Sequence, residues 1–211
     1  MKKLSETYKE LGIAFKFPIK IKDSNGYETY YETSDGFWYK NEYDSKGNKT
    51  YHENSNGFWC KYEYDANGNE TYHENSDGYF GKREYDSKGN ETYYETSYGF
   101  WYKNEYDSNG KMTYHETSSG FWCKYEYDAN GNQTYYNNSN GLWYKKEYDS
   151  DGNQTYYKHS DGYWCKSEYN SDGNKTYDED SEGIKIGTPR SQSCEGKVIE
   201  VDGIKYELKA L

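Results

Sequence analysis

The sequence is poor in the aliphatic residues that fill most protein cores. Valine, leucine and isoleucine together occur only 14 times in 211 residues, which excludes a thick sandwich core built from leucine and valine. Few aliphatic residues and a formal charge of −11 would also fit a disordered chain. The aromatic fraction of 20% argues against disorder, because disordered chains contain few aromatics. We therefore expect a folded chain whose apolar material is tyrosine, tryptophan and phenylalanine.

The chain also lacks long apolar runs, a signal sequence and an excess of basic residues. Residues 1–23 contain no apolar signal core, and no apolar run reaches 18 residues, so we expect neither export nor a membrane span. The net acidity disfavours direct binding to duplex nucleic acid, which usually needs a basic face. The same acidity is compatible with a basic partner or with solubility alone.

Cysteines are few, and their spacing does not suggest disulfide bonds. Cys60, Cys123 and Cys165 occupy one position of a sequence repeat, in copies at least two repeats apart, and Cys194 follows the repeats. Free thiols are the simplest interpretation, because the cytosol keeps thiols reduced. We therefore expect a cytoplasmic protein.

A motif of 21 residues recurs along most of the chain. Eight copies cover residues 22–186, the first of them degenerate, and seven start with a Tyr-Asp or Tyr-Asn pair. Residues 37–72 and 100–135 match at 30 of 36 positions, three copies apart. Such an array has grown by duplication of a block, which suits a scaffold better than a single active site. The repeated pairs start at Tyr43, Tyr64, Tyr85, Tyr106, Tyr127, Tyr148 and Tyr169.

Two glycine columns punctuate every copy and predict two turns in each. The columns begin at Gly26 and Gly36, and most of their glycines follow asparagine or aspartate, a strong hairpin signal. The segments between the turns are rich in aromatic and β-branched residues, which favour strands. The predicted fold class is all-β: an elongated, twisted antiparallel β-meander of about eight hairpin repeats.

Strand alternation assigns side chains to two faces of the sheet. One face, which we call the tryptophan face, carries tryptophan, lysine and glutamate columns of the longer strand. The other, which we call the opposite face, carries the column that begins with Phe37 and Phe58. On the tryptophan face the columns are Trp38, Trp59, Phe80, Trp101, Trp122, Trp143 and Trp164; Lys40, Lys61, Lys82, Lys103, Lys124, Lys145 and Lys166; and Glu42, Glu63, Glu84, Glu105, Glu126, Glu147 and Glu168.

The register between strands depends on the loop type. A two-residue loop would place Lys40 opposite Glu53, whereas a three-residue loop with a bulged glycine would shift that pairing by one residue. The sequence leaves both loops open.

The two ends of the chain differ from the repeats. Residues 1–21 are predicted to form an N-terminal cap, with a helix over 4–12, Ser5 as a candidate N-cap, and a strand over 14–21. After the array (22–186), residues 187–196 read as a linker. Residues 197–211 are predicted to form a hairpin on Asp202-Gly203, which either caps the array or docks elsewhere. Sheet edges and this hairpin are also candidate sites of oligomerisation.

The pattern Tyr-Asp-x-x-Gly-Asn-x-Thr, as in Tyr64–Thr71, resembles the tyrosine–aspartate (YD) repeats of rearrangement-hotspot proteins and teneurins. The repeat length near 21 matches as well. In that family the repeats form long coiled β-sheet shells around toxin domains. This chain is far shorter, has a Phe-Trp-x-Lys strand outside the usual consensus and shows no toxin domain, so the resemblance implies hairpins rather than encapsulation.

Two further resemblances concern the hairpin tips and the chain ends. The Asn-Gly-Phe-Trp hairpins resemble choline- and glucan-binding repeats of cell-surface proteins. The short leader and residues 194–211 resemble small accessory proteins of bacteriophages and prophages.

Metal and catalytic motifs are weak. His52 and Cys60 could form a metal pair across a hairpin, but each copy offers two ligands where zinc takes four. Asp149, Asp151 and Asn153 have calcium-loop spacing, which a hairpin turn explains equally well. No catalytic grouping stands outside the near-equal copies. We therefore predict no metal, no cofactor and no enzymatic activity.

The tryptophan face is the strongest functional signal. Aromatic rings beside cations can stack on bases or sugars, although the glutamate column weakens nucleic-acid binding, and tryptophan packing under lysine stems is the structural alternative. The candidate binding residues are Trp38, Trp59, Trp101, Trp122, Trp143, Trp164, Lys40, Lys61, Lys103 and Lys124.

The predicted function is that of a non-enzymatic repeat protein that binds a macromolecule, with a protein as the expected partner. In a phage or prophage setting it would inhibit a host defence protein in the host cytoplasm, by mimicry of nucleic acid. The alternatives are a carbohydrate- or cell-wall-binding module and a structural fragment of a YD-repeat scaffold.

Overall fold

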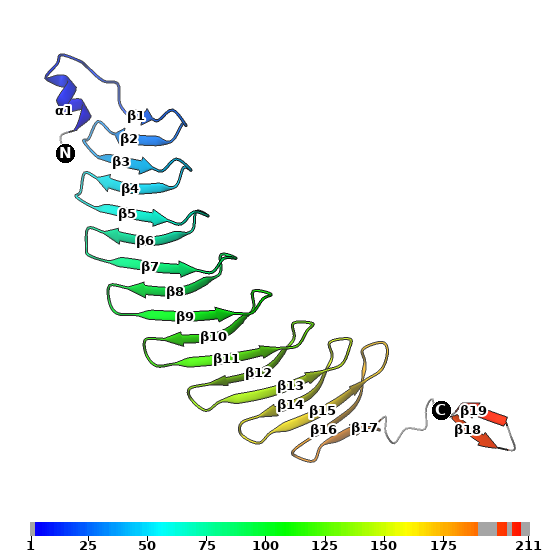
Figure 1. The fold of residues 1–211 in the computed structure, drawn as a ribbon. Helices are drawn as coiled ribbons and strands as arrows, with labels where there is room; N and C mark the ends of the chain where they lie inside the picture. Colours follow the sequence, from blue (N-terminus) through cyan, green and yellow to red (C-terminus); the bar gives the residue numbers. More distant parts are fainter. Residues whose placement is uncertain (1–2, 190–197, 202–203, 208–211) are drawn as a thin grey trace. The chain divides into compact units, whose positions relative to one another are not determined.

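The computed structural model describes residues 3–189, 198–201 and 204–207, which contain one helix and nineteen strands. Strands β1 to β17 form one open antiparallel meander sheet, and β18 (Val198–Val201) pairs with β19 (Ile204–Glu207) (Figure 1). The predicted all-β hairpin meander, with a short N-terminal helix and a C-terminal hairpin, is confirmed. Residues 190–196 of the predicted linker, Cys194, and the predicted Asp202-Gly203 turn lie outside the described residues.

The chain divides into two compact units. The first unit comprises residues up to Lys111 together with Glu116–Ser119. It contains α1 (Leu4–Lys9), β1 (Ile19–Lys22), β2 (Glu28–Glu32), β3 (Trp38–Tyr43), β4 (Lys49–Asn54), β5 (Trp59–Tyr64), β6 (Glu70–Asn75), β7 (Phe80–Tyr85), β8 (Glu91–Thr96) and β9 (Trp101–Tyr106).

The second unit comprises Met112–His115 and the chain from Gly120 onward, so that β10 (Met112–Thr117) contributes to both units. The other strands of its repeats are β11 (Trp122–Tyr127), β12 (Gln133–Asn138), β13 (Trp143–Tyr148), β14 (Gln154–His159), β15 (Trp164–Tyr169), β16 (Lys175–Asp180) and β17 (Lys185–Gly187).

Both turns of a copy are three-residue loops that end in glycine. In the first turn the Gly47 N–H donates to the Asp44 carbonyl (3.1 Å) and the Asp44 N–H to the Asn48 carbonyl (2.9 Å). Gly47 has a φ of 88°, a conformation that costs glycine little and other residues more. The second turn repeats this pattern over residues 54–58, where Gly57 has a φ of 83°.

A β-bulge sets the register of the hairpins that close on the first turn. Lys40 lies opposite Glu53, the pairing expected of a two-residue loop, although the loop has three residues. The extra residue is Thr50, at which the pairing shifts by one between Glu42 and Tyr43. The same shift recurs in β5–β6, β7–β8, β11–β12, β13–β14 and β15–β16.

The tyrosine hydroxyl of each Tyr-Asp pair donates to a backbone carbonyl that lies beyond the end of a strand ladder. The β4–β5 ladder ends at the pair Tyr51–Lys61. Beyond that end, the Tyr64 hydroxyl donates to the carbonyl of Lys49 (2.9 Å). Tyr85 makes the equivalent bond 21 residues on, at 2.9 Å. The repeated tyrosine therefore has a structural task in addition to its apolar surface.

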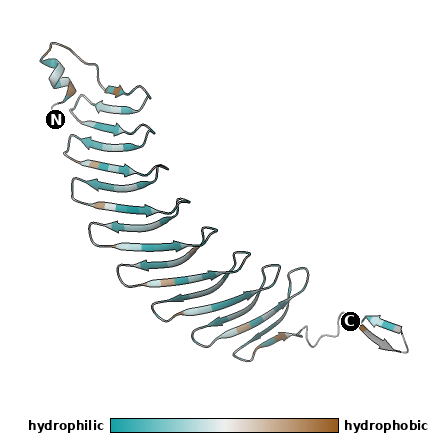
Figure 2. Ribbon diagram, in the orientation of Figure 1, coloured by the Kyte–Doolittle hydropathy of each residue, from teal (hydrophilic) through white to brown (hydrophobic). Residues whose placement is uncertain are grey.

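Most side chains of the sheet are only half-buried. Figure 2 shows hydrophilic colours along most of the strands, with hydrophobic residues scattered among them. Among the described residues the buried hydrophobic side chains number five, and three of them form one cluster: Ile19, Tyr30 and Trp38. The sheet is stabilised mainly by its ladders and by cross-strand aromatic pairs, such as Tyr31 and Tyr39 with ring centroids 5.1 Å apart.

The N-terminal cap differs from its predicted form in two respects. Helix α1 ends at Lys9, its N-cap is Lys3, and Ser5 lies inside the helix, so the N-cap prediction for Ser5 was wrong. Its hydroxyl instead reaches a sheet residue, described below. The predicted strand over 14–21 is reduced to β1, which begins at Ile19 directly after a Phe-Pro step; proline lacks the N–H that a ladder needs.

Candidate functional site

The tryptophan face of the first unit alternates two kinds of strand. Glu32 lies opposite Trp38 and Tyr30 opposite Lys40, so the short strands contribute a tyrosine and a glutamate to the same face. We call each such pair, two residues apart, a Tyr–Glu pair. The pairs of the first unit are Tyr30 and Glu32, Tyr51 and Glu53, Tyr72 and Glu74, and Tyr93 and Glu95.

Lysine ammonium groups lie over the tryptophan rings. Lys61 Nζ is 5.2 Å from the Trp59 ring centroid, and Lys103 Nζ is 5.4 Å from that of Trp101. These are cation–π distances, and the long lysine stems cover part of each ring. The rings are half-buried while Lys61 and Lys103 stay exposed. The packing of tryptophan beneath lysine is therefore present, and the outer surface stays polar.

The second unit keeps the tryptophan column but loses the glutamate of two short strands, β12 and β14, while β16 keeps a Tyr–Glu pair in Tyr177 and Glu179. Lys166 Nζ lies 5.6 Å from the Trp164 ring centroid. Where the first unit has glutamate, β12 has Asn137 and β14 has Lys158. Lys158 Nζ lies 6.0 Å from the Trp143 ring centroid. Strand alternation places all ten predicted residues on the tryptophan face: Trp38, Trp59, Trp101, Trp122, Trp143, Trp164, Lys40, Lys61, Lys103 and Lys124.

Helix α1 covers the tryptophan face at β2 and β3. Leu4 and Phe15 pack against the cluster of Ile19, Tyr30 and Trp38. Trp38 is consequently only 7% exposed. One candidate binding residue is thus already occupied by the chain itself.

Hydrogen bonds fix the first turn of α1 on the first Tyr–Glu pair. The Leu4 N–H donates to the Tyr30 hydroxyl oxygen (3.1 Å), and the Ser5 N–H donates to Glu32 Oε2 (3.1 Å). The Ser5 hydroxyl donates to Glu32 Oε1, and the Tyr30 hydroxyl donates to Glu32 Oε2 (2.9 Å). Glu32 is 1% exposed, and a carboxylate buried to that degree is stable only with such donors.

The ionisation of this pair reflects its burial and its bonds. Burial raises the pKa of Tyr30 to about 12, and the neighbouring Glu32 carboxylate adds to the rise. Burial alone would raise the pKa of Glu32, but the hydroxyl and N–H of Ser5 stabilise the carboxylate and hold its pKa below the ordinary value. Glu32 is therefore a charged acceptor at neutral pH.

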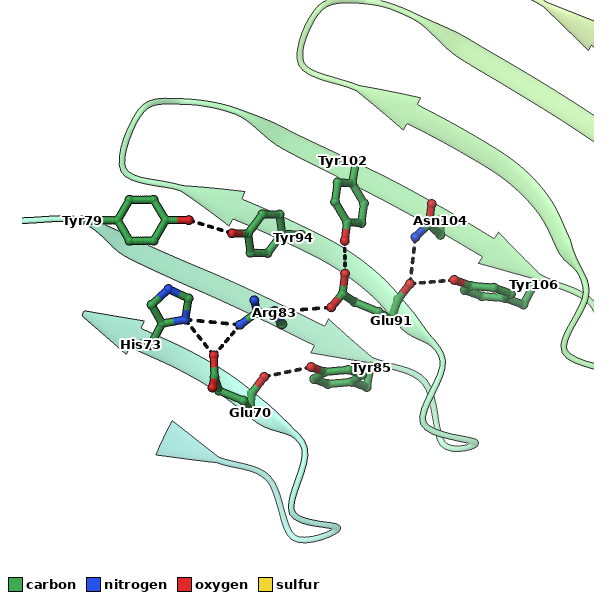
Figure 3. Close-up of polar contacts among 10 residues, drawn as sticks. All are labelled: Glu70, His73, Tyr79, Arg83, Tyr85, Glu91, Tyr94, Tyr102, Asn104 and Tyr106. Atoms are coloured by element: carbon green, nitrogen blue, oxygen red, sulfur yellow. Dashed lines mark hydrogen bonds and ion pairs between the residues drawn. The ribbon is translucent and has the colours of Figure 1, made fainter. Parts of the chain in front are cut away.

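The opposite face of the first unit holds a polar network centred on Arg83 (Figure 3). Arg83 Nη1 lies 2.5 Å from a Glu70 carboxylate oxygen, and Arg83 Nε lies 3.3 Å from Glu91. His73 Nδ1 is 2.7 Å from the same Glu70 oxygen, and the Tyr102 hydroxyl donates to Glu91. Each charged group thus has a charged or polar partner within the network, which joins two successive copies.

Gly81 makes room for this network. A Cβ at Gly81 would lie 2.5 Å from His73 Cε1, so any larger residue would displace the imidazole. In the other full copies this column holds tyrosine or cysteine, for example Tyr102. The network is an adjustment of packing between copies, and its mutually bonded groups offer no free nucleophile.

The candidate calcium ligand Asp149 accepts hydrogen bonds within its own turn. Asp149 Oδ1 accepts from the N–H groups of Asp151 (3.0 Å) and Asn153 (2.8 Å), and Asn153 Nδ2 donates to its Oδ2 (3.0 Å). The Asn153 side chain is the largest cause that lowers the pKa of Asp149. His52 lies opposite Cys60 as predicted. Within the described part of the chain, no three His, Cys, Asp or Glu side chains group as metal ligands.

The site residues that sequence reasoning missed are Tyr30, Glu32 and Ser5. Periodicity gave the faces of the strands but assigned no role to the short-strand glutamates. One feature of the sequence could have pointed to them. Residues 28–43 and 91–106 differ at a single position, and the first of these two hairpins follows the predicted helix closely in sequence, so a helix could pack on that hairpin.

No model of a known protein family matches the sequence, and a comparison with curated proteins finds no match. Solved structures give partial matches. The chain is 15% identical to a chain of the Photorhabdus luminescens Tc holotoxin pore with mutated TccC3, at a TM-score of 0.45, covering 72% of this chain and 10% of that one.

Two crystal structures are similar in the same way. For TcdB2-TccC3 the identity is 10% and the TM-score 0.49, covering 80% of this chain and 11% of that one. For TcdB2-TccC3-Cdc42 the identity is 12% and the TM-score 0.39, covering 77% and 11%. These neighbours are proteins of the YD-repeat type. This chain spans about a tenth of their length, and the phage-like character of its ends stays a prediction.

The described residues contain no helix long and apolar enough to cross a membrane.

Proposed function

We propose that the protein is a non-enzymatic β-hairpin repeat scaffold that binds a protein partner on the tryptophan face of its first unit. The observation that supports this is that the tryptophans of that face are covered to different extents. Trp38 lies under α1, whereas Trp59 and Trp101 are half-buried beneath single lysine side chains. Aromatic anchors surrounded by polar groups are typical of binding surfaces.

The test is recovery of a partner from a bacterial lysate by the full chain and by variants of each face. We expect wild type and Phe100→Ala, a change on the opposite face, to recover the same protein, and Trp59→Ala/Trp101→Ala to lose it. Thermal unfolding of each variant shows whether it is folded. Equal recovery by all three chains, with the double variant folded, would refute the proposal.

The finer form of the proposal is a phage-encoded inhibitor of a host defence protein that acts as a mimic of nucleic acid. The formal charge of −11 supports a basic partner. Mimicry predicts that the recovered partner also binds nucleic acid, that nucleic acid competes for it, and that affinity falls steeply with salt. A partner without these properties would reject mimicry. Selective binding on a glycan array would instead favour the carbohydrate-binding alternative.

A further inference from the structure

The hairpin that binds α1 is present twice in the first unit. Residues 28–43 and 91–106 are identical at 15 of 16 positions, and the single difference places Tyr98 in the turn where the first hairpin has Asp35. They form β2–β3 and β8–β9 with equivalent registers. The chain therefore carries a second platform with the same tyrosine, glutamate and tryptophan as the one that α1 occupies. The strand beside it differs, because Lys82 of β7 lies opposite Glu95 where Ile19 of β1 lies opposite Glu32.

The second platform has its acceptors in place without a helix over it. The Tyr93 hydroxyl donates to Glu95 Oε2 (3.1 Å), as the Tyr30 hydroxyl does to Glu32 Oε2 (2.9 Å). Trp101, Tyr93 and Glu95 are all half-buried, whereas their counterparts under α1 are buried. The Tyr–Glu geometry thus exists before any helix binds, which lowers the entropic cost of docking.

We infer that the tryptophan face at β8–β9 is a docking site for a short helix of the protein partner, bound as α1 is bound at β2–β3. The partner helix carries an aliphatic residue followed by serine or threonine in its first turn. This inference rests on the proposed function and names the chemistry of its partner.

Each feature of that helix answers a group on the platform. The aliphatic side chain takes the place of Leu4 and lies on Trp101. Two backbone N–H groups of the first turn donate to the Tyr93 hydroxyl and to Glu95, and the serine or threonine hydroxyl donates to the second Glu95 oxygen. The negative charge of Glu95 also suits the positive end of a helix dipole. Lys103, now over Trp101, moves aside on binding.

A second copy of this chain is a poorer occupant than a different partner. Its α1 would have to leave β2–β3 of its own chain, and it would regain at β8–β9 only the bonds that it had lost. Such an exchange gains no contacts and loses the high effective concentration of a linked segment. A partner whose helix has no competing site in its own chain bears no such loss.

The second unit provides matched negative sites. Its tryptophans Trp143 and Trp164 follow short strands with Asn137 and Lys158 in place of the glutamate. The lysine ammonium has no acceptor, and the neutral amide has one weaker acceptor oxygen. The carboxylate therefore separates β8–β9 from these two sites, since the tryptophan is common to all three. The β4–β5 hairpin, where Glu53 lies opposite Trp59, keeps the carboxylate and is not a negative site.

The experiment uses full-length protein and a synthetic peptide with the sequence of residues 1–12. Indole N–H signals of the six tryptophans are followed by NMR as peptide is added. An isolated short helix is marginal in water, so we expect a Kd of about 1 mM, the weak end of specific binding. The Trp101 signal should shift with dose, and Trp143 and Trp164 should not. No shift of Trp101 at several-fold this concentration, or equal shifts at all three, would overturn the inference.

Two matched variants test the carboxylate. Glu95→Ala should weaken peptide binding about tenfold, the loss expected when charge-assisted bonds are removed. Glu63→Ala, which removes the same charge from an exposed position of the tryptophan face on β5, should leave binding at Trp101 unchanged. Equal effects would count against the docking geometry. The two proposals can fail separately. If the full chain recovers a lysate partner in a manner that depends on Trp59 and Trp101 but does not bind the peptide, this inference is wrong and the proposed function stands.

Discussion

The β2–β3 and β8–β9 hairpins have nearly the same sequence and very different surroundings. Under α1, Glu32 is 1% exposed and Trp38 7%, whereas Glu95 and Trp101 remain half-exposed. Fifteen shared residues of sixteen therefore do not determine burial; the surroundings do. Helix α1 lies over the first hairpin, and Ile19 lies opposite Glu32 where Lys82 lies opposite Glu95. The comparison also separates two requirements of this fold: a repeat folds with both faces half-open, and among the pairs described above the carboxylate of a Tyr–Glu pair is buried only where a helix covers it.

Removal of the glutamate should give the largest difference in stability loss between the two hairpins. Glu32→Ala leaves the Ser5 N–H and hydroxyl without their acceptor under α1, and we expect a loss of about 2 kcal/mol in stability of the cap. Glu95→Ala should cost at most about 0.5 kcal/mol, because water replaces the lost acceptor. Amide hydrogen exchange in β1 and β2 measures the first loss, and exchange in β8 and β9 the second. Equal losses would mean that α1 does not depend on Glu32.

Acid should release α1 without a matching change at β8–β9. The pKa of Glu32 is held below its ordinary value of 4.5 in the folded protein, so its contribution is present above pH 4.5 and is lost as pH falls through the lowered folded value. The NMR indole signal of Trp38 should then move toward that of an exposed tryptophan. Glu32→Gln should remove this pH dependence, and its persistence in that variant would assign the transition to another group.

The two tyrosine hydroxyls should differ by a smaller amount. Tyr30→Phe removes the acceptor of the Leu4 N–H and one donor to Glu32, with an expected cost of about 1 kcal/mol. Tyr93→Phe removes only the donor to Glu95, and about 0.5 kcal/mol or less should be lost. Urea unfolding of both variants gives the two values. A larger effect of Tyr93→Phe would show that the hydroxyl matters more to the repeat than to the cap.

An exchange of the two turn residues should have the smallest effect. Asp35 accepts a bond from the Thr33 hydroxyl in its own turn, and Tyr98 is 83% exposed. The double variant Asp35→Tyr/Tyr98→Asp makes each hairpin carry the turn residue of the other. Hydrogen exchange should still find β2–β3 protected under α1. If protection moved to β8–β9, the turn residue and not the linked helix would be the cause of the different protection of the two hairpins.

Much of this arrangement follows from sequence, and its exceptions have physical causes. Alternation predicts that Trp38 and Lys40 share a face, and the glycine columns predict turns that need positive φ, as at Gly47. The contact between Ser5 and Glu32 spans 27 residues and depends on how the cap folds back, which no local pattern encodes. Gly81 is a departure from its column whose reason lies in a neighbouring strand. Which surface binds a partner stays a prediction.

The bulge at Thr50 has a consequence for how such an array can lengthen. Lys40 lies opposite Glu53, and Glu53 opposite Trp59, so two sheet steps align residues 19 apart in sequence. The repeat is 21 residues long, and each copy is thus offset from the last by two residues, about 7 Å along the strands. Without the bulge the offset would be one residue, and tryptophans of successive copies would point to alternate sides. The bulge keeps this offset even, so blocks of 21 residues can be inserted or lost while every remaining tryptophan stays on its side of the sheet.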